Sequence, residues 1–380
     1  MTAHPPIRLN DLDAQRRRIG DAVDAAVKRV MDHGQFIMGP EVAALETALE
    51  AFCDARHVVS CSNGTDALVL ALRAKSVGPG DAVIVPSFTF AASAEAVALV
   101  SASPVFADID PGTFNLDPDS VEDAIRTART AGLRPVAIIA VDLFGQPADY
   151  RALTQIAEDQ GLWLLADAAQ SLGARYHNRP VGSLAPLTTA SFFPAKPLGC
   201  YGDGGAVLTD DEETATLLRS LRVHGKGDHK YDNVRIGQNA RLDTLQAAVL
   251  LEKLKVFPEE IEARNQVADR YRLGLSDLVE TPSVVEGCQS VWAQYTIRVP
   301  DGRRDSLAAH LAAREISTAI YYPKPLHRQK AYENYQMASG GLPASEKAAG
   351  EVLSLPMHPY LDVESQDRVL EALRDAMATS

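Results

Sequence analysis

Short apolar runs alternate with amphipathic stretches over most of the chain. Apolar runs of strand length predict strands at 57–60, 82–85, 104–107, 135–141, 162–166, 188–193 and 205–209. Apolar residues at helical spacing predict helices at 11–33, 40–52, 90–100, 118–130, 149–160 and 211–222, with another that begins at about Asp66. This alternation is typical of a largely parallel sheet with helices on both faces.

The first two helices carry recognisable end signals. Asp11 or Asp13 is suited to cap the first helix, and Gly34 would end it. Pro40 fits the first position of the second helix, where its missing N–H costs nothing.

The pattern changes in the last third of the chain. A long helical region at 240–275 contains Pro258, which predicts a kink or a break. Beyond it we expect a strand at 291–299, a helix at 304–314, a proline-rich loop at 320–327 and a final helix at 362–378. The change places a boundary near residue 255, between a large domain (1–255) and a smaller α+β domain (256–380).

Composition and charge narrow the function. The 380 residues carry a formal net charge of −13, the opposite of what binding to nucleic acid or an anionic membrane surface requires. No apolar run approaches the length of a membrane span, and no apolar signal segment is visible at the N-terminus. The four cysteines form no CxxC pair, which fits a reducing compartment, so we expect a cytoplasmic protein.

Lys196 is isolated in a loop of aromatic, apolar and glycine residues, Ser191–Gly205. No other lysine lies within 25 positions on either side. Burial lowers the pKa of a lysine, and a neutral amine can form a Schiff base, the linkage that holds pyridoxal phosphate. The alternative is an ordinary surface lysine.

Asp167 follows the buried run Leu162–Ala166 directly. Ligands of open α/β sheets bind at the carboxyl ends of strands, and the pyridine nitrogen of pyridoxal phosphate needs an anion beside it. Gln170 could then donate to the ring oxygen. The alternative for Asp167 is a helix N-cap.

Two further segments suit the same cofactor. Ser62–Thr65 precedes an apolar helix, whose N-terminus could bind phosphate through Gly64 and Thr65, although a plain capped turn has the same pattern. Phe90 could stack on the pyridine ring, although core packing is the usual role of phenylalanine. The histidines show no metal-binding spacing, so no metal site is expected.

A polar, basic stretch lies between the predicted helix at 211–222 and the long helical region. Its end, Gly237–Arg241, could have Asn239 as a helix cap and a solvated Arg241. Positive charge collects in this stretch and could meet an anionic ligand; the residues concerned are Arg222, His224, Lys226, Lys230, Arg235 and Arg241.

The chain resembles the DegT/StrS-type sugar-nucleotide aminotransferases, within the fold-type I pyridoxal phosphate enzymes. The resemblance covers nearly the whole chain. It rests on the ordered segments Gly34–Val42, Ser62–Leu68, Asp167–Gln170, Ser191–Lys196, Gly202–Gly205, Asn239–Asp243 and Tyr322–His327. It implies an α/β fold with a mostly parallel, mixed sheet flanked by helices and a smaller C-terminal α+β domain.

The resemblance also implies roles for the site residues. Lys196 would hold the cofactor and move the proton, Asp167 would pair with the ring nitrogen, and Gln170 would contact the ring oxygen. The phosphate contacts and the stacking residue would be Gly64, Thr65, Ser191 and Phe90. In this family the asparagine of Gly-x-Asn-x-Arg reaches the neighbouring subunit's cofactor, so Asn239 implies a homodimer with shared active sites.

Substrate contacts are implied at Arg241, His224, Tyr321, Tyr322 and His327. The most similar branch transfers an amino group from L-glutamate to UDP-2-acetamido-2-deoxy-3-oxo-D-glucuronate, for cell-surface polysaccharide such as O-antigen of lipopolysaccharide. Many relatives have His-Tyr-Pro where this chain has Tyr321-Tyr322-Pro323. Alternatives are therefore a dTDP-linked 3-keto-6-deoxyhexose or a 4-keto sugar nucleotide.

Two other functions fit less well. Relatives that act as sugar dehydratases replace the Schiff-base lysine with histidine, and Lys196 is present here. A non-catalytic regulatory protein with the same fold would not need that lysine, and no DNA-binding segment is visible.

Overall fold

The computed structural model describes residues 5–229 and 231–378. Its helices are α1 (Leu12–His33), α2 (Pro40–Cys53), α3 (Gly64–Ala74), α4 (Ala92–Leu99), α5 (Pro118–Thr130), α6 (Tyr150–Gln160), α7 (Glu212–Leu221), α8 (Thr244–Leu275), α9 (Arg304–Ala312), α10 (Pro343–Glu351) and α11 (Val363–Ala378). Its strands are β1 (His57–Cys61), β2 (Asp81–Pro86), β3 (Ser103–Ala107), β4 (Arg134–Val141), β5 (Trp163–Asp167), β6 (Arg175–Tyr176), β7 (Arg179–Pro180), β8 (Leu187–Ser191), β9 (Gly205–Thr209), β10 (Cys288–Gln289), β11 (Tyr295–Arg298) and β12 (Val352–Leu355).

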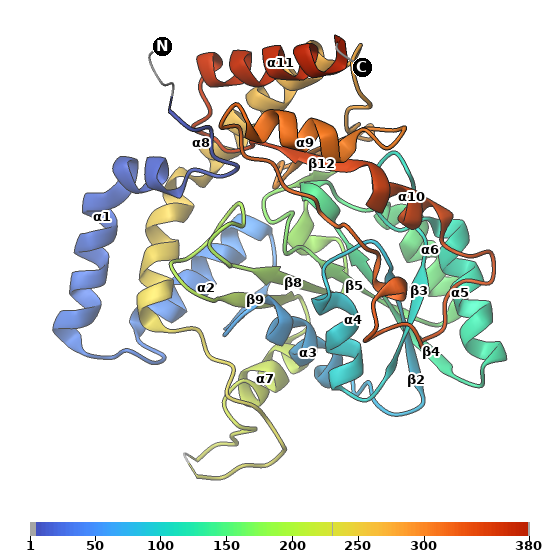
Figure 1. Ribbon diagram of the computed structural model, residues 1–380. Coiled ribbons are helices and arrows are strands. Elements are labelled where there is room, and N and C mark those ends of the chain that lie inside the picture. Colours follow the sequence, from blue (N-terminus) through green and yellow to red (C-terminus); the bar gives the residue numbers. More distant parts are fainter. Residues whose placement is uncertain (1–4, 230, 379–380) are drawn as a thin grey trace.

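A seven-stranded sheet forms the centre of the larger part, in the order β1-β9-β8-β5-β4-β2-β3. The pairs from β8 to β3 are parallel, while β9 runs antiparallel to both β8 and β1. Helices α3, α4 and α7 pack together on the sheet, α5 and α6 form a separate pair on it, and α2 packs on β1 (Figure 1). The predicted mostly parallel sheet flanked by helices is therefore confirmed.

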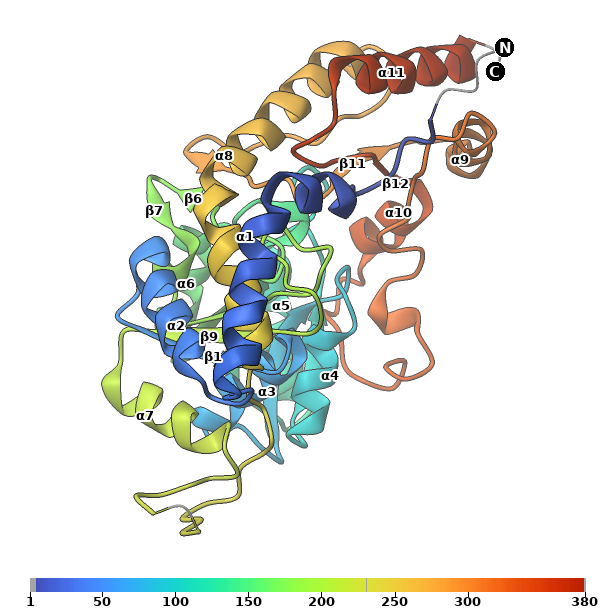
Figure 2. The ribbon, with the colours of Figure 1, turned by 90° about the vertical axis from the view of Figure 1, so that its left-hand side faces the viewer.

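A smaller part is built around the antiparallel pair of strands β11 and β12. Its apolar core includes residues of α9, α11 and the second half of α8, and it is separate from the core around the large sheet. Ile7 joins this smaller core from the start of the chain. In Figures 1 and 2, α8 runs from the level of the sheet up to α11. The two cores meet along α8, and the division near residue 255 stays a prediction.

Local sequence signals explain most element ends. The side chain of Asp11 accepts the N–H of Ala14 and caps α1, and Gly34 ends that helix with φ of 72°. The sequence predicted a kink or a break at Pro258, and the break is wrong, because α8 continues through this residue. A proline inside a helix costs about 3 kcal/mol, and here the neighbouring Phe257 and Ile261 are buried in the main core. Packing of α8 outweighs the cost.

Five elements were not predicted from the sequence: α10, β12, β6, β7 and β10. Helix α10 leads straight into β12, and β6, β7 and β10 form a small sheet of two-residue strands. The strand expected at 291–299 is shorter, from Tyr295 to Arg298. Across residues 5–229 and 231–378, no helix is both long and apolar enough to cross a membrane.

A buried ion pair fixes the end of β1 relative to the helices around it. The Arg222 side chain, 5% exposed, pairs with Glu46 of α2 and donates to the carbonyl oxygen of Ser60 at 2.8 Å. Glu46 also accepts from the Ser60 backbone N–H (2.9 Å) and hydroxyl (2.7 Å). This network positions the segment that leaves β1, which matters for the site below.

We therefore expect Glu46→Ala to lower the free energy of unfolding by about 3 kcal/mol, because it leaves the Arg222 cation buried without its partner. Denaturant titration of the cofactor-free protein measures the loss. The control is Lys28→Ala, which breaks the exposed Lys28–Asp32 pair of α1 and should change stability by less than about 1 kcal/mol. Equal losses in the two variants would contradict the importance given to the buried pair.

Candidate active site

The carboxyl ends of the parallel strands bring the predicted site residues to one edge of the sheet. Strand β5 ends in Asp167 and β8 ends in Ser191. Strand β1 lies parallel to β8, since both are antiparallel to β9, so the segment after Cys61 reaches the same edge. The loop with Lys196 connects β8 to β9 there. This edge is the usual ligand site of an open α/β sheet.

Asp167 is 6% exposed and accepts hydrogen bonds from the Ser93 hydroxyl (3.3 Å) and the Ala169 N–H (3.2 Å). Burial raises the pKa of this carboxyl, while the Ala169 N–H and the charge of Lys196 oppose the rise. The helix-cap alternative is wrong, because a turn and not a helix follows Asp167. A buried carboxylate with two hydrogen bonds is suited to receive a cationic ligand group.

Lys196 is partly buried, and burial lowers the pKa of its amine against the opposing charge of Asp167. In the described part of the chain it forms no ion pair. Its backbone N–H donates to the carbonyl of Phe193, and the Cys200 N–H donates to that of Phe192, both at 2.8 Å. The loop is thus folded on itself, and Lys196 is not an ordinary surface lysine. A lowered pKa makes the neutral amine, the nucleophilic form, more available.

Helix α3 begins at Gly64 and presents the free N–H groups of its first turn at the sheet edge. The side chain of Asn63 accepts the Asp66 N–H and caps the helix, so this segment is a capped turn, as the alternative had it. The cap does not prevent the other N–H groups of the first turn from binding a ligand. A Cβ on Gly64 would lie 2.7 Å from the Cβ of Ser191, and a Cβ on Gly205 would lie 2.4 Å from the Asn63 carbonyl oxygen. Glycine is required at both positions, and their close approach brings the Ser191 hydroxyl to the start of α3. This arrangement can bind a phosphate group.

Aromatic and amide groups lie beside these residues. Phe90 is 57% exposed, so it is not a core residue, whereas Phe88 is buried. The ring of Tyr322 lies 6.4 Å from that of Phe90 and 6.0 Å from that of Phe88. Gln170 accepts the Phe144 N–H at 2.7 Å, which turns its NH₂ group towards the Tyr322 hydroxyl, 3.4 Å away. The structure thus brings Phe90, Gln170 and Tyr322 together.

His327 is placed differently. It is buried, its Nδ1 lies 2.7 Å from the Ser87 hydroxyl, and its Nε2 lies 3.1 Å from Glu346. Both ring nitrogens therefore have partners inside the chain, so His327 has no free ring nitrogen with which to contact a substrate. Tyr321, whose ring centroid lies 5.9 Å from that of Tyr322, remains at the site.

Asn239 and Arg241 line a hollow of about 450 Å³ beside the start of α3. Its other lining residues are Ser62, Asn63, Gly202, Asp203, Asp243 and Gln246. Asn239 is not the cap of α8, because that position belongs to Asp243. The Nε atom of Arg241 is buried and has no hydrogen-bond partner among the described residues. A polar hollow with an unsatisfied arginine can receive an anion.

Positive charge is less concentrated in the basic stretch than its sequence implies. Arg222 is buried in its ion pair with Glu46, so its assignment to an anion-binding cluster is wrong. Arg235 donates to the hydroxyl of Ser220, and His224 is exposed. Lys230 lies outside the described residues.

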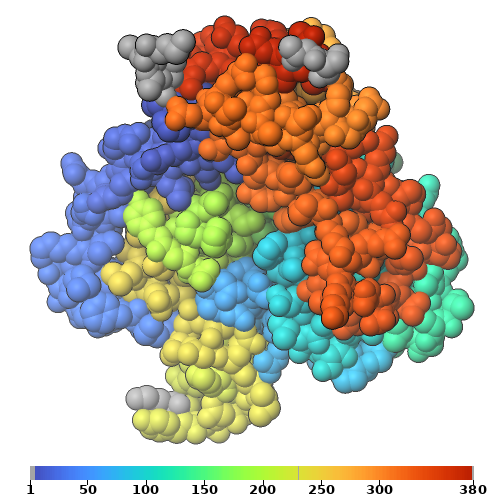
Figure 3. Space-filling model, viewed as in Figure 1, coloured from blue at the N-terminus to red at the C-terminus, as the bar shows by residue number. Residues whose placement is uncertain are grey.

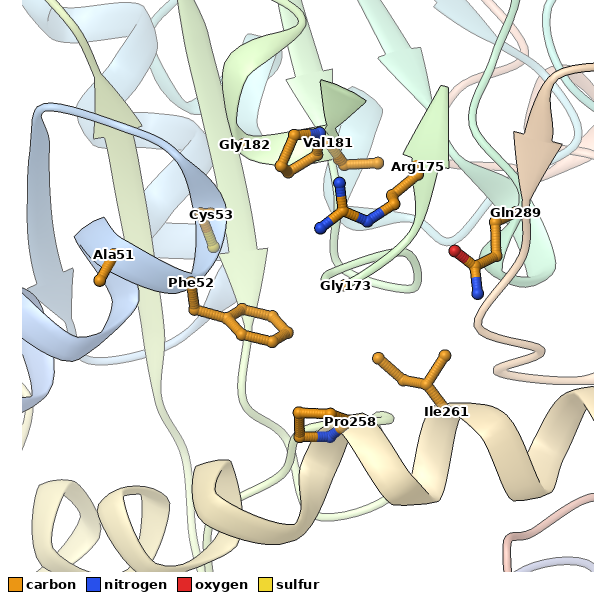
Figure 4. Close-up of a pocket in the computed structure, with 11 residues that line it drawn as sticks. Ala51, Phe52, Cys53, Gly173, Arg175, Val181, Gly182, Pro258, Ile261 and Gln289 are labelled. Atoms are coloured by element: carbon orange, nitrogen blue, oxygen red, sulfur yellow. The ribbon is translucent and has the colours of Figure 1, made fainter. Parts of the chain in front are cut away.

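A cavity of about 380 Å³ lies elsewhere in the molecule, between α2, β6, β7 and α8 (Figure 4). Phe52, Pro258 and Ile261 form its apolar side, and Arg175 and Gln289 its polar side. None of the predicted site residues lines it. It is therefore separate from the candidate active site.

Sequence reasoning missed three groups that orient the site. Asp142 follows the last residue of β4, and Asp167 is the last residue of β5, so the rule that found Asp167 could have found Asp142 too. Ser93 and the backbone N–H of Phe144 hold Asp167 and Gln170. No sequence pattern indicates either contact, because both depend on how distant segments pack.

Residues 17–374 match the model of the DegT/DnrJ/EryC1/StrS aminotransferase family. The chain is 49% identical over 368 residues to the UDP-2-acetamido-2-deoxy-3-oxo-D-glucuronate aminotransferase of Pseudomonas aeruginosa, covering 97% of this chain and 99% of that protein.

Solved structures of aminotransferases have the same fold as this chain. A DegT DnrJ EryC1 StrS aminotransferase from Brucella abortus superposes with a TM-score of 0.95 at 51% identity, covering 97% of this chain and 99% of that one. NtdA of Bacillus subtilis, solved with its bound cofactor PMP, has a TM-score of 0.89 at 32% identity, covering 100% of this chain and 86% of that one. The predicted fold, enzyme class and cofactor, pyridoxal phosphate, are confirmed. The chain belongs to the DegT/DnrJ/EryC1/StrS aminotransferase family.

Proposed function

We propose that the protein transfers the amino group of L-glutamate to a nucleotide-linked 3-keto-sugar, namely UDP-2-acetamido-2-deoxy-3-oxo-D-glucuronate. The reaction would serve synthesis of a cell-surface polysaccharide such as O-antigen, in the cytoplasm. The observation that carries the proposed chemistry is the placement of buried Asp167 at the end of β5 and of Lys196 in the loop from β8 to β9, at the same sheet edge as the start of α3. The charge of Asp167 also opposes the lowering of the Lys196 pKa by burial. The choice of sugar is supported by the substrate of the P. aeruginosa relative.

The residues present fit pyridoxal phosphate. The start of α3, with Gly64 and Thr65, and the Ser191 hydroxyl would hold the phosphate. Asp167 has no cationic hydrogen-bond partner in the described chain, so its buried carboxylate would pair with the ring nitrogen. The exposed Phe90 would cover the ring, and Gln170 would face its oxygen.

Bound pyridoxal phosphate supplies an electron sink for the carbon that loses its proton. Lys196 Nζ, which burial favours in its neutral form, takes the proton from the α-carbon of glutamate. In the second half of the reaction the same atom gives a proton to C3 of the sugar. Asp167 stays anionic and holds the proton on the ring nitrogen.

The anionic groups of the substrates would be bound in and around the hollow lined by Asn239 and Arg241. Arg241, with its unsatisfied Nε, is placed for a carboxylate or a diphosphate. Tyr321 and Tyr322 would contact the sugar, and exposed His224 would reach the nucleotide part. In Figure 3 the yellow-green segment around the Lys196 loop reaches the surface between α1 (blue) and the smaller part (orange).

We further propose a homodimer in which Asn239 completes the neighbouring subunit's phosphate site. The loop before α2 supports this: Phe36, Ile37 and Met38 are 43%, 45% and 40% exposed. Ile37 pairs with Asp243, so these apolar side chains lie close to the segment of Asn239. A second copy of the chain would cover them.

The proposed sugar is tested with a panel of nucleotide keto-sugars, each incubated with glutamate and analysed by mass spectrometry. We expect the UDP-linked 3-keto uronate to be aminated at least roughly 10-fold faster than a dTDP-linked 3-keto-6-deoxyhexose or a 4-keto sugar, because an enzyme rejects a substrate that leaves its polar groups unpaired. Lys196→Ala is the control for uncatalysed product. Faster amination of a dTDP-linked sugar would overturn the substrate but keep the chemistry.

Asp167→Asn should fold, since the side chains have nearly the same shape. Turnover should fall by roughly 100-fold, because the ring proton loses its anionic partner. Steady-state kinetics measures the rate, and thermal melting checks the fold. Turnover at the wild-type level would show that the charge of Asp167 is not needed.

Shared active sites are tested by mixing two inactive variants, Lys196→Ala and Asn239→Asp, and allowing subunits to exchange. In a mixed dimer one site carries both changes and the other carries neither. Random exchange should restore roughly a quarter of wild-type activity, since half of the dimers then have one intact site of two. Each variant incubated alone is the control. Exchange without recovered activity would rule out sharing, provided that Asn239→Asp alone is severely impaired.

A further inference from the structure

A second carboxylate lies behind the active-site carboxylate. Asp142 follows β4, which pairs with β5 in parallel register so that Val141 lies opposite Asp167. The Asp142 side chain is completely buried, and its backbone N–H donates to the Asp167 carbonyl oxygen at 3.1 Å. None of the functions assigned above uses it.

Three donors converge on this carboxylate. Oδ1 accepts the Ala148 N–H (2.8 Å) and the Tyr150 hydroxyl (2.9 Å), and Oδ2 accepts the Ser171 hydroxyl (2.6 Å). Burial raises the pKa of Asp142 to about 7; the donors oppose the rise and the charge of Asp167 adds to it. A buried group with this many bonds holds its partners firmly.

Two of these donors belong to the segments that hold Gln170. Ser171 is the next residue in the turn that starts at Asp167, and it is fully buried. Ala148 ends the segment after β4 that contains Phe144, whose N–H donates to the Gln170 side chain at 2.7 Å. Asp142 therefore ties the turn with Asp167 and Gln170 to the segment that orients the Gln170 amide.

We propose that Asp142 is a positioning residue of the transamination site. Through Ser171 it holds the turn so that the Asp167 carboxylate and the Gln170 amide face the cofactor ring. The inference rests on the proposed binding of pyridoxal phosphate at this edge, but not on the identity of the sugar. It differs from a purely structural role, in which Asp142 would only stabilise the fold.

The chain offers a matched pair of variants that separates the two roles. Ser171→Ala and Tyr150→Phe each remove one buried hydroxyl donor from the same carboxylate, at 2.6 and 2.9 Å. Only Ser171 belongs to the turn; Tyr150 belongs to α6, and the Ala148 N–H still holds Oδ1 in its absence. We expect the two variants to lose similar stability but to differ in how tightly they bind the cofactor.

Three quantities are measured for both variants: the melting temperature of the cofactor-free protein, the dissociation constant of pyridoxal phosphate by absorbance titration, and the rate of the half-reaction with glutamate. Ser171→Ala should weaken cofactor binding and slow the half-reaction, each by roughly 10-fold, the order expected for the loss of one buried hydrogen bond. Tyr150→Phe should melt at a similarly lowered temperature yet keep both values within roughly twofold of wild type.

A double-variant cycle strengthens the test. If Asp142 acts through Ser171, the effects of Asp142→Asn and Ser171→Ala on cofactor binding should be non-additive. Equal cofactor affinity and rate in Ser171→Ala and Tyr150→Phe would overturn the positioning role. Failure of the wild-type protein to bind pyridoxal phosphate would instead overturn the proposed function.

Discussion

The site depends on holding a carboxylate, Asp167, and an amine, Lys196, at one edge of the sheet, where the carboxylate must stay charged and the amine must be able to become neutral. Burial favours the neutral form of both Asp167 and Lys196, and each charge moderates the shift of the other. The amine can act as a nucleophile and proton carrier only if it is neutral at times, whereas the carboxylate serves the ring only if it stays charged. Ser93 and the Ala169 N–H, which donate to Asp167, stabilise the charged form of the carboxylate.

The sheet makes this arrangement possible. Strands β1, β5 and β8 end at the same edge, and the close contacts at Gly64 and Gly205 bring two of these strand ends together without side chains between them. The buried Arg222–Glu46 pair anchors this end of β1 through its hydrogen bonds to Ser60. Rigid strands thus position residues that are far apart in the sequence, and the loops add the reactive groups.

Much of this could be predicted from the sequence. Apolar runs located the strands, and residues at their ends, Asp167 above all, follow from the rule that ligands bind where parallel strands end. The surroundings of Arg222 and His327 could not be predicted, because a charged or polar side chain gives no sign of whether a partner such as Glu46 or Glu346 will lie beside it. Contacts across the fold decide that, and they are not local properties of the chain.

The effect of Pro258 also depends on contacts across the fold, because the packing of α8 outweighs the tendency of proline to end a helix. Asp142 is different: its position after β4 was visible in the sequence, but its three donors come from segments that only the fold brings together.

The most direct test of the account is where the cofactor attaches. The protein is loaded with pyridoxal phosphate, reduced with borohydride, digested and mapped by mass spectrometry. Lys253 is an internal control, because it is also a buried lysine: it is 1% exposed, and burial lowers its pKa to about 8. It lies on α8 against the ring of Tyr201 and is not one of the predicted site residues. The account predicts that the label appears on Lys196 and not on Lys253. Labelling of Lys253 or any other lysine, with Lys196 unmodified, would contradict it.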